Sequence, residues 1–258
     1  MHPGFGGKCL LLKAANIEFT HVSLPQNLKE AKAELRSQGV ELIDTAAMGK
    51  ALATTKDYGV EDVLFFERPY MVVFNSEANN GHEKWMVRWD CCFEQSKKGG
   101  SEVLDAFRSM YDGGAGMVEQ FIPDALKTVQ TLWSCAPGGA DRFHSNKRDV
   151  DAEAARHASD FGRWQTNQHD LPGQRSAMYW LAPMVAHSCY PNVEWEDPDV
   201  DGRVSLRCIR PIHKGDLLGV NYMQKEFLQL PVGPRKAILK AKRFFDCMCF
   251  RCQTESEG

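Results

Sequence analysis

Three cysteines stand within six residues near the end of this chain, in the run Cys247-Met248-Cys249-Phe250-Arg251-Cys252. Thiolates at this spacing are typical of a structural zinc site, and such a site takes four ligands in a tetrahedral arrangement. A fourth ligand must therefore come from elsewhere in the chain. Cys189 is the candidate, because it precedes a proline in a segment that looks like a structured turn after an apolar run. A metal bound in this way would tie the middle of the chain to its tail.

The composition is that of a globular chain in a reducing compartment. The 258 residues are 43% hydrophobic and 25% charged, which suits a real core in one or two domains. The formal net charge of -3 gives no electrostatic reason to expect direct nucleic-acid binding. The run Leu10-Leu11-Leu12 is too short for a secretory signal, and apolar runs such as Val63–Phe66 are strand-sized, so no membrane span is expected. We therefore expect reduced thiols and a location in the cytoplasm, the nucleus or both.

The first part of the chain predicts a short helix followed by strands. Residues 28–38 carry alanine and leucine among lysine and glutamate, which indicates a helix that ends at Gly39. Residues 40–43 predict a strand. Residues 48–54 and 58–69 leave two interpretations open. They form two strands joined by turns, or their first turn uses small residues so that backbone N–H groups can approach a ligand.

Residues 76–170 look like a helical insert between two halves of a fold. Ser101 can cap a first helix, residues 118–133 predict a longer amphipathic helix, and residues 151–164 predict a third. Glycine pairs at 113–114 and 138–139 separate these helices. The charged run 142–151 predicts an exposed loop.

The last part of the chain returns to strands. Residues 193–196 and 204–209 predict a hairpin, and residues 217–222 predict the last strand. Pro234 opens a basic helix that runs to about Phe245 and delivers the chain to the cysteines. We expect this helix to turn three side chains inward: Ile238, Ala241 and Phe245.

Three motifs in this part resemble those of the SET-domain protein lysine methyltransferases, in order and in spacing. The run Ala186-His187-Ser188-Cys189-Tyr190-Pro191-Asn192 is similar to their Asn-His-Ser-Cys-x-Pro-Asn signature. Asn221-Tyr222 is similar to their catalytic-tyrosine segment. Phe245-Asp246-Cys247-x-Cys249-x-x-Cys252 resembles their post-SET zinc motif, in the form seen in the SET-and-MYND branch. A weaker match to their first segment lies at residues 48–69, where Ala51 takes the place of a glycine.

The resemblance implies an α+β chain with a mostly β SET fold, in which small antiparallel sheets surround a knot-like core. It divides the chain into an N-terminal extension (residues 1–37), a SET N-terminal segment (38–75), the helical insert (76–170), a SET C-terminal segment (171–227) and a post-SET zinc-binding region (228–258). The MYND zinc module of that branch needs more ligands than Cys91, Cys92 and Cys135 supply between residues 70 and 180. The chain is therefore expected to lack a MYND module.

The activity implied by the resemblance is S-adenosylmethionine-dependent methylation of a lysine on a protein or peptide, histone or non-histone. Tyr222 would be the catalytic residue, because a phenol oxygen and nearby backbone carbonyls favour an electron-poor methyl group and hold the lysine amine in line. Structural zinc would be bound by Cys189, Cys247, Cys249 and Cys252. The cofactor would contact Lys50, Ala51, Leu52, Asn167, Met184, Val185, Ala186, His187, Tyr222 and Phe250, with Phe250 stacking on adenine.

One departure from the signature leaves an alternative open. Ala186 stands where the signature has an asparagine that grips the cofactor, and one such hydrogen bond is typically worth about 0.5–1.5 kcal/mol. The alternative is therefore a catalytically degenerate SET-fold protein that acts as a protein-interaction module. A zinc-knuckle nucleic-acid binder that uses the basic helix at 235–243 is disfavoured.

His187 and Cys189 could also suggest a Cys–His nucleophile pair. A thiolate held by zinc is not a free nucleophile, so we expect His187 to be a packed or backbone-contacting histidine instead. The sequence does not indicate an oligomeric state or a particular substrate protein.

Overall fold

In the computed structural model, the described residues are 28–46, 49–74, 105, 107–134, 147–173 and 175–256. The chain forms two compact units, one that includes residues 71–178 and one that includes residues 21–70 and 179–258. The predicted helix after Ser101 lies mostly outside the described residues, as do Gly138, Gly139 and three of the cysteines, Cys91, Cys92 and Cys135. The finer five-part division of the chain stays a prediction.

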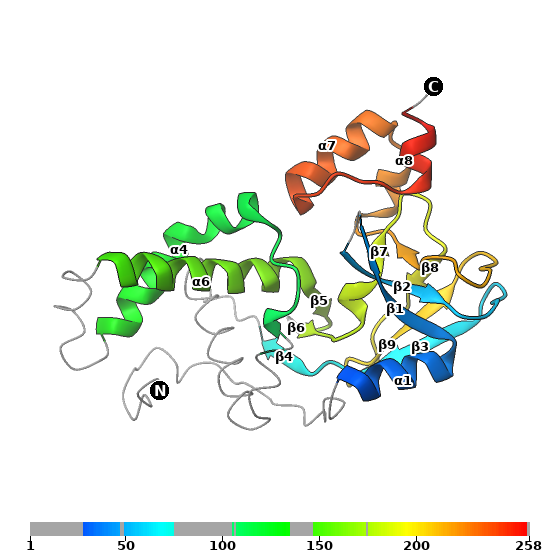
Figure 1. Ribbon diagram of the computed structural model, residues 1–258, viewed down its shortest axis with the longest axis horizontal. Helices are drawn as coiled ribbons and strands as arrows, with labels where there is room; N and C mark the ends of the chain where they lie inside the picture. The colour runs from blue at the N-terminus through cyan, green and yellow to red at the C-terminus, as the bar shows by residue number, and fades with distance from the viewer. Residues whose placement is uncertain are drawn as a thin grey trace. The chain divides into compact units, whose positions relative to one another are not determined.

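The unit that includes residues 71–178 pairs two long helices and has one small sheet. Helices α4 (Ala115–Ser134) and α6 (Lys147–Asn167) lie side by side (Figure 1). The strands β4 (Met71–Phe74), β6 (Arg175–Met178) and β5 (Gln168–Leu171) form an antiparallel sheet with β6 in the centre. The predicted helices at 118–133 and 151–164 are thus confirmed, with wider bounds.

The exposed loop predicted for residues 142–151 is wrong in its last part. Residues 147–151 form the first turns of α6, and of these residues Val150 is buried. Its side chain continues the apolar stripe of the helix at Ala154, one turn later. Asp149 also lies in the first turn, where a negative charge suits the helix dipole. A charged run on the solvent side of a helix was therefore mistaken for a loop.

The other unit begins with α1 (Leu28–Gln38) and the antiparallel pair β1 (Val40–Thr45) and β2 (Gly49–Thr54). A second sheet has the strand order β3 (Val63–Glu67), β9 (Val204–Cys208), β8 (Val193–Trp195), all antiparallel. This sheet confirms the predicted hairpin of β8 and β9. A third, parallel pair joins β7 (Ala186–His187) to β10 (Gly219–Val220).

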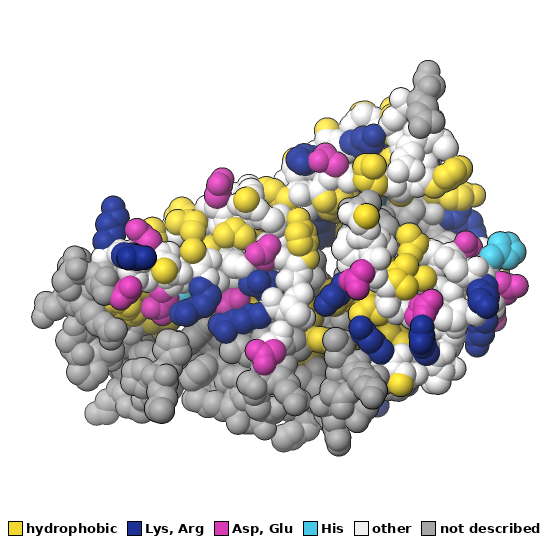
Figure 2. Space-filling view, viewed as in Figure 1, with side chains coloured by type: hydrophobic (Ala, Val, Ile, Leu, Met, Phe, Trp, Pro, Cys, Tyr) yellow, Lys and Arg dark blue, Asp and Glu magenta, His cyan; other side chains and the backbone are white. Residues whose placement is uncertain are grey.

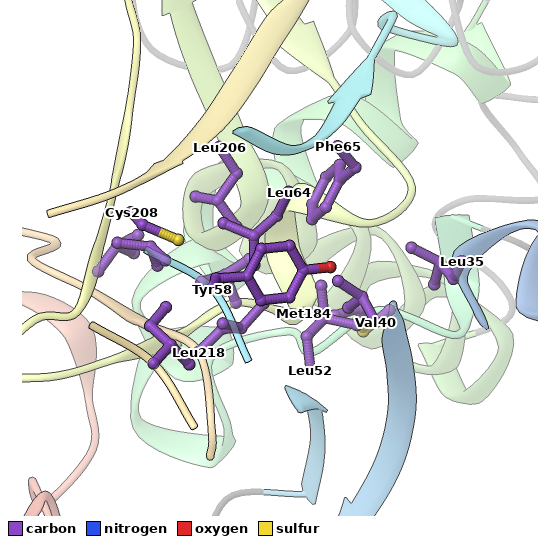
Figure 3. Packing of buried hydrophobic residues seen from close by; sticks show 14 residues of the cluster. Leu35, Val40, Leu52, Tyr58, Leu64, Phe65, Met184, Leu206, Cys208 and Leu218 are labelled. Carbon is purple, nitrogen blue, oxygen red and sulfur yellow. The ribbon is translucent and has the colours of Figure 1, made fainter. Parts of the chain in front are cut away.

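One hydrophobic cluster joins these sheets to one another. Figure 3 shows Tyr58 in its middle, with Leu64, Phe65 and Leu206 on one side and Leu52, Val40 and Met184 on the other. Leu52, Leu206 and Leu218 have no exposed surface. The Tyr58 hydroxyl reaches the carbonyl of Gln38 at the end of α1, so its one polar atom is satisfied inside the cluster. The cluster fixes the base on which β7 and β10 lie.

The last predicted strand, residues 217–222, is shorter than expected because it changes partners. Leu217 bridges to Ala53 of β2, and the Leu218 amide donates to the carbonyl of Leu52. The next residues, Gly219 and Val220, pair instead with β7. The side chain of Asn192 fastens this exchange, since it donates to the carbonyl of Leu217 and accepts the amide N–H of Gly219. Backbone pairing and the side chain of Asn192 thus join residues 186–192 to residues 217–220.

The tail consists of η3 (Lys225–Gln229), α7 (Val232–Arg243) and α8 (Phe250–Thr254), with α7 and α8 side by side in Figure 1. Helix α7 begins two residues before the predicted Pro234. It ends at Phe244, whose left-handed backbone (φ 60°) reverses the chain toward the cysteines. The prediction that Ala241 points inward is wrong, because the buried side chains of α7 are Arg235 and Leu239 and Ala241 lies on another face.

Gly219 offers a direct test of the exchange between β2 and β7. A Cβ on Gly219 would lie 2.7 Å from Cβ of Ser188. Gly219→Ala therefore forces β10 away from the residue that follows β7. We expect a loss of about 1–3 kcal/mol in unfolding free energy, measured by urea denaturation. Gly233→Ala in α7 is the matched control, because nothing lies within 4 Å of the added atom. It should leave stability unchanged or raise it by about 1 kcal/mol. Equal stabilities for the two variants would contradict this packing.

Candidate active site and metal cluster

Four cysteine sulfurs meet where the end of β7 approaches the tail. The Sγ atoms of Cys189, Cys247, Cys249 and Cys252 all lie within 4.8 Å of one another. The Sγ atom of Cys189 is 3.9 Å from that of Cys247 and 3.5 Å from that of Cys252. The backbone amide of Cys189 also donates to the sulfur of Cys249 at 3.4 Å. The structure thus brings the mid-chain cysteine and the three tail cysteines together. We call these residues the cysteine cluster.

The geometry of the cysteine cluster fits a tetrahedral zinc ion. Zn–S bonds of about 2.3 Å place the sulfurs of a tetrahedron about 3.8 Å apart, close to the separations seen here. Hydrogen bonds with Cys247 and Cys249 raise the pKa of the Cys189 thiol, whereas hydrogen bonds from Cys189 and Cys247 lower the pKa of Cys249. A bound cation would take the place of the shared protons. The cluster could therefore hold zinc.

Two arginines and one glutamate surround the cysteine cluster. Arg235 has no exposed surface, and its guanidinium donates to a carboxylate oxygen of Glu255 at 2.6 Å and lies 3.7 Å from the sulfur of Cys252. Arg251 donates to the same carboxylate at 2.6 Å and to the carbonyl of Cys189 at 3.2 Å. Arg235 thus places a positive charge beside the sulfur of Cys252. Sequence reasoning missed Arg235, because an arginine in a basic helix is ordinarily expected at the surface.

Tyr222 is held from three sides. Its hydroxyl donates to the carbonyl of Val185 at 2.6 Å, its amide donates to Nδ1 of His187 at 3.1 Å, and its carbonyl accepts from Arg243 at 3.2 Å. The ring packs edge-on against Phe245. Burial raises the pKa of the Tyr222 phenol to about 12, so the hydroxyl stays protonated at neutral pH. Tyr222 can offer an oxygen dipole here but is a poor general base.

His187 makes the backbone contact that the sequence led us to expect. It is buried, accepts the amide N–H of Tyr222, and places Nε2 3.3 Å from the sulfur of Cys189. Burial lowers the pKa of His187 to about 4, so the ring is neutral at physiological pH. The site therefore contains a neutral imidazole between Tyr222 and the cysteine cluster.

Glu67 anchors the segment that leads to β7, and sequence reasoning did not assign it a role. One carboxylate oxygen accepts the amides of Trp180 and Leu181 at 2.6 and 2.7 Å, and the other accepts the amide of Ala182 at 2.8 Å. Burial raises the pKa of the Glu67 carboxyl to about 7 against the opposing effect of the three amides. The short helix η2 (Ala182–Met184) follows directly, so Glu67 fixes where Val185 and Ala186 begin. The sequence signal that could have identified it is the run Glu67-Arg68-Pro69 at the end of β3.

The remaining predicted cofactor residues differ in how exposed they are and in which unit they lie. In β2, Lys50 is exposed, whereas Ala51 and Leu52 are buried in the core. Met184 and Val185 belong to that same hydrophobic cluster. Phe250 opens α8 and is 74% exposed. Asn167 lies in the unit that includes residues 71–178, where its amide donates to the carbonyls of Tyr111 and Arg163. The cofactor roles of these residues stay predictions.

The profile of the SET domain matches residues 49–223. The chain belongs to the SET domain family. This is a methyltransferase family, and the chain shows its mixed α+β fold of small sheets. In the solved SET domain of LSMT bound to lysine and AdoHcy, 58% of the chain aligns with 86% of this one, with a TM-score of 0.50 and 12% identity. The fold class predicted from the motifs is thus confirmed.

Two curated proteins also match this SET chain. A SET and MYND domain-containing protein of Dictyostelium discoideum is 37% identical over 72 residues, which are 28% of this chain and 17% of that protein. The potential protein lysine methyltransferase SET6 of Saccharomyces cerevisiae is 28% identical over 132 residues, which are 50% of this chain and 34% of that protein. The matched segments thus cover 17% and 34% of the length of these two relatives. Among the described residues of the SET chain, no helix is long and apolar enough to span a membrane.

Glu67 makes the stability of the unit that includes residues 21–70 and 179–258 depend on pH. Its pKa is raised from 4.5 to about 7, so the folded chain binds this proton more tightly than the unfolded chain does. The stabilising contribution is complete below the unfolded-state pKa and is lost as the pH rises through the folded-state pKa. We expect the stability difference between wild type and Glu67→Gln to fall across this window, by at most about 1.4 kcal/mol per pH unit.

Urea denaturation of wild type and Glu67→Gln between about pH 5 and pH 8 measures this difference. Glu226→Gln, which changes an exposed glutamate of η3, is the control and should follow wild type at every pH. Parallel curves for wild type and Glu67→Gln would contradict the assignment.

Proposed function

We propose that this SET chain is an S-adenosylmethionine-dependent protein lysine N-methyltransferase with a structural zinc site in its tail. The observation that carries the proposal is the arrangement of Tyr222, whose hydroxyl lies 2.6 Å from the carbonyl of Val185 beside the segment 186–192. Membership of the SET family and the AdoHcy-bound structure with the same fold support the choice of cofactor.

Two oxygens, those of the Tyr222 phenol and the Val185 carbonyl, would act on the reacting methyl group. S-adenosylmethionine, when bound, supplies a methyl group on a positively charged sulfur. The proton of the Tyr222 hydroxyl is committed to the carbonyl of Val185, so the lone pairs of the phenol oxygen remain to face an electron-poor carbon. Because the phenol stays neutral, Tyr222 would align and polarise rather than remove a proton. The lysine amine must arrive already deprotonated, which burial in a narrow site would favour.

The remaining cofactor contacts are proposed from position in the fold. Phe250 stands between Cys249 and Cys252 and keeps a largely exposed ring, which suits stacking on adenine. Met184–His187 and Lys50–Leu52 would contribute mainly through backbone groups, since Met184, Val185, Ala51 and Leu52 have buried side chains. Asn167 is retained as a proposed contact.

Ala186 favours a second candidate, a catalytically degenerate SET protein that binds a protein partner. Its methyl group cannot supply the hydrogen bond that an asparagine would offer the cofactor. Calorimetric titration with S-adenosylmethionine separates the candidates. Measurable binding by the zinc-loaded chain supports the methyltransferase, and no binding supports the interaction module.

The substrate would be a protein or peptide that presents a lysine, histone or non-histone. Direct nucleic-acid binding remains disfavoured by the net charge of -3. On the face shown in Figure 2, basic and acidic side chains of the described residues are interspersed, which is consistent with that expectation.

The catalytic role of Tyr222 is tested by Tyr222→Phe. Without the hydroxyl, both the contact with Val185 and the oxygen dipole are lost, and we expect methyl transfer to fall by about a hundredfold or more. The measurement is transfer of labelled methyl from S-adenosylmethionine to a lysine peptide array. Tyr190→Phe, which alters an exposed tyrosine stacked on Arg210, is the matched control and should keep wild-type activity. Equal rates for wild type and Tyr222→Phe would contradict the role.

The zinc site is tested by the metal content of cysteine variants. We expect about one zinc ion per chain in wild type and a loss of zinc in Cys252→Ser, because three ligands leave the tetrahedron open. Cys208→Ala removes a buried thiol of β9 that is not part of the cysteine cluster, so it should retain zinc. Elemental analysis after gel filtration gives the content. Zinc that persists in Cys252→Ser would contradict the assignment.

A further inference from the structure

We propose that His187 is a positioning residue that couples metal binding in the cysteine cluster to the placement of Tyr222. The inference rests on the proposed zinc site, but it assigns to this one side chain a role that a purely structural metal does not require. The observation behind it is that the two ring nitrogens of His187 face the two sites, one each.

The hydrogen-bond partners fix the tautomer of the ring. A backbone N–H can only donate, so Nδ1 of His187 must present a lone pair to the amide of Tyr222 at 3.1 Å. In a neutral imidazole the proton then resides on Nε2, which lies 3.3 Å from the sulfur of Cys189. His187 therefore donates to the cysteine cluster and accepts from the backbone of Tyr222 at the same time.

The strength of these two bonds depends on the metal. A zinc-bound thiolate is a stronger hydrogen-bond acceptor than a thiol, because the bond to it is charge-assisted. A stronger bond at Nε2 makes the ring more basic at Nδ1, and so strengthens the bond to the amide of Tyr222. Metal binding by the cysteine cluster would thus strengthen the hydrogen bond between His187 and the amide of Tyr222, the residue proposed to act on the methyl group.

The surroundings leave the ring little freedom to do otherwise. The centroid of His187 lies 5.3 Å from that of Tyr222, 6.0 Å from that of Phe227 and 5.9 Å from that of Phe245. This aromatic enclosure opposes rotation of the imidazole. Tyr222 is also bonded through its hydroxyl to Val185, two residues before His187. A shift of Cys189 would therefore move β7 and both attachments of Tyr222 together.

Two substitutions cut the bridge at opposite ends. In His187→Asn the side-chain oxygen can take the place of Nδ1 and keep the amide of Tyr222, but no group reaches the sulfur. In His187→Gln the side-chain amide can take the place of Nε2 and keep the sulfur, but the acceptor for Tyr222 is lost. Circular dichroism and zinc content establish that each variant is folded and loaded.

The test is nuclear magnetic resonance of the full chain, with zinc exchanged for cadmium so that the protein stays folded. In wild type we expect the Nε2-protonated tautomer of His187. We also expect a change in the Tyr222 amide shift on metal exchange, because zinc and cadmium leave different charges on the Cys189 sulfur that accepts from Nε2. In His187→Asn and His187→Gln we expect that change to fall to less than about half, as one bond of the bridge is missing in each.

An Nδ1-protonated ring in wild type, or a Tyr222 response as large in His187→Asn as in wild type, would overturn the coupling. A wild-type chain that binds neither metal would overturn the zinc site and this inference with it. The readout does not use activity, so coupling found in a chain without methyl transfer would support the inference and contradict only the proposed function.

Discussion

The contact of Cys189 with the three cysteines of the tail holds the tail against the segment that follows β7. The segments that carry these sulfurs have little regular structure to hold them, since β7 is two residues long and α8 is five. The hydrophobic cluster of the tail contains three of the four cysteines, and its other buried members are Phe227 and Leu239. A metal ion shared by the four sulfurs would therefore account for most of the order in this region.

The position of Tyr222 depends on this contact. Tyr222 follows the residues that change their pairing partner from β2 to β7. Hydrogen bonds of Asn192 stabilise this change of partner, and Gly219 leaves space for it because it has no side chain. Glu67 holds the residues just before β7, because its carboxylate accepts the amides of residues 180–182. The proposed reaction needs oxygens that are held in place before the substrate arrives. Here a hydrogen bond from the Tyr222 hydroxyl to the Val185 carbonyl holds both oxygens.

The sequence predicted those features that local chemistry determines. Three closely spaced cysteines, the Asn-Tyr pair and the hairpin of β8 and β9 could be recognised because spacing and alternation are local patterns. It could not predict the burial of Arg235, since that depends on Glu255 and a sulfur lying across the fold. The misplaced Ala241 has the same origin, because the face of α7 that turns inward is set by its partners. Residues 147–151 failed for a different reason, as charge alone does not separate a loop from an exposed helical turn.

The proposed position of Tyr222 depends on a single zinc ion bound by the four sulfurs of the cysteine cluster. X-ray absorption at the zinc edge of the purified full chain measures these ligands. We expect a first coordination shell of four sulfurs at about 2.3 Å, with no nitrogen or oxygen. A shell that contains a nitrogen, such as that of His187 taking the place of one cysteine, or only three sulfurs, would contradict it.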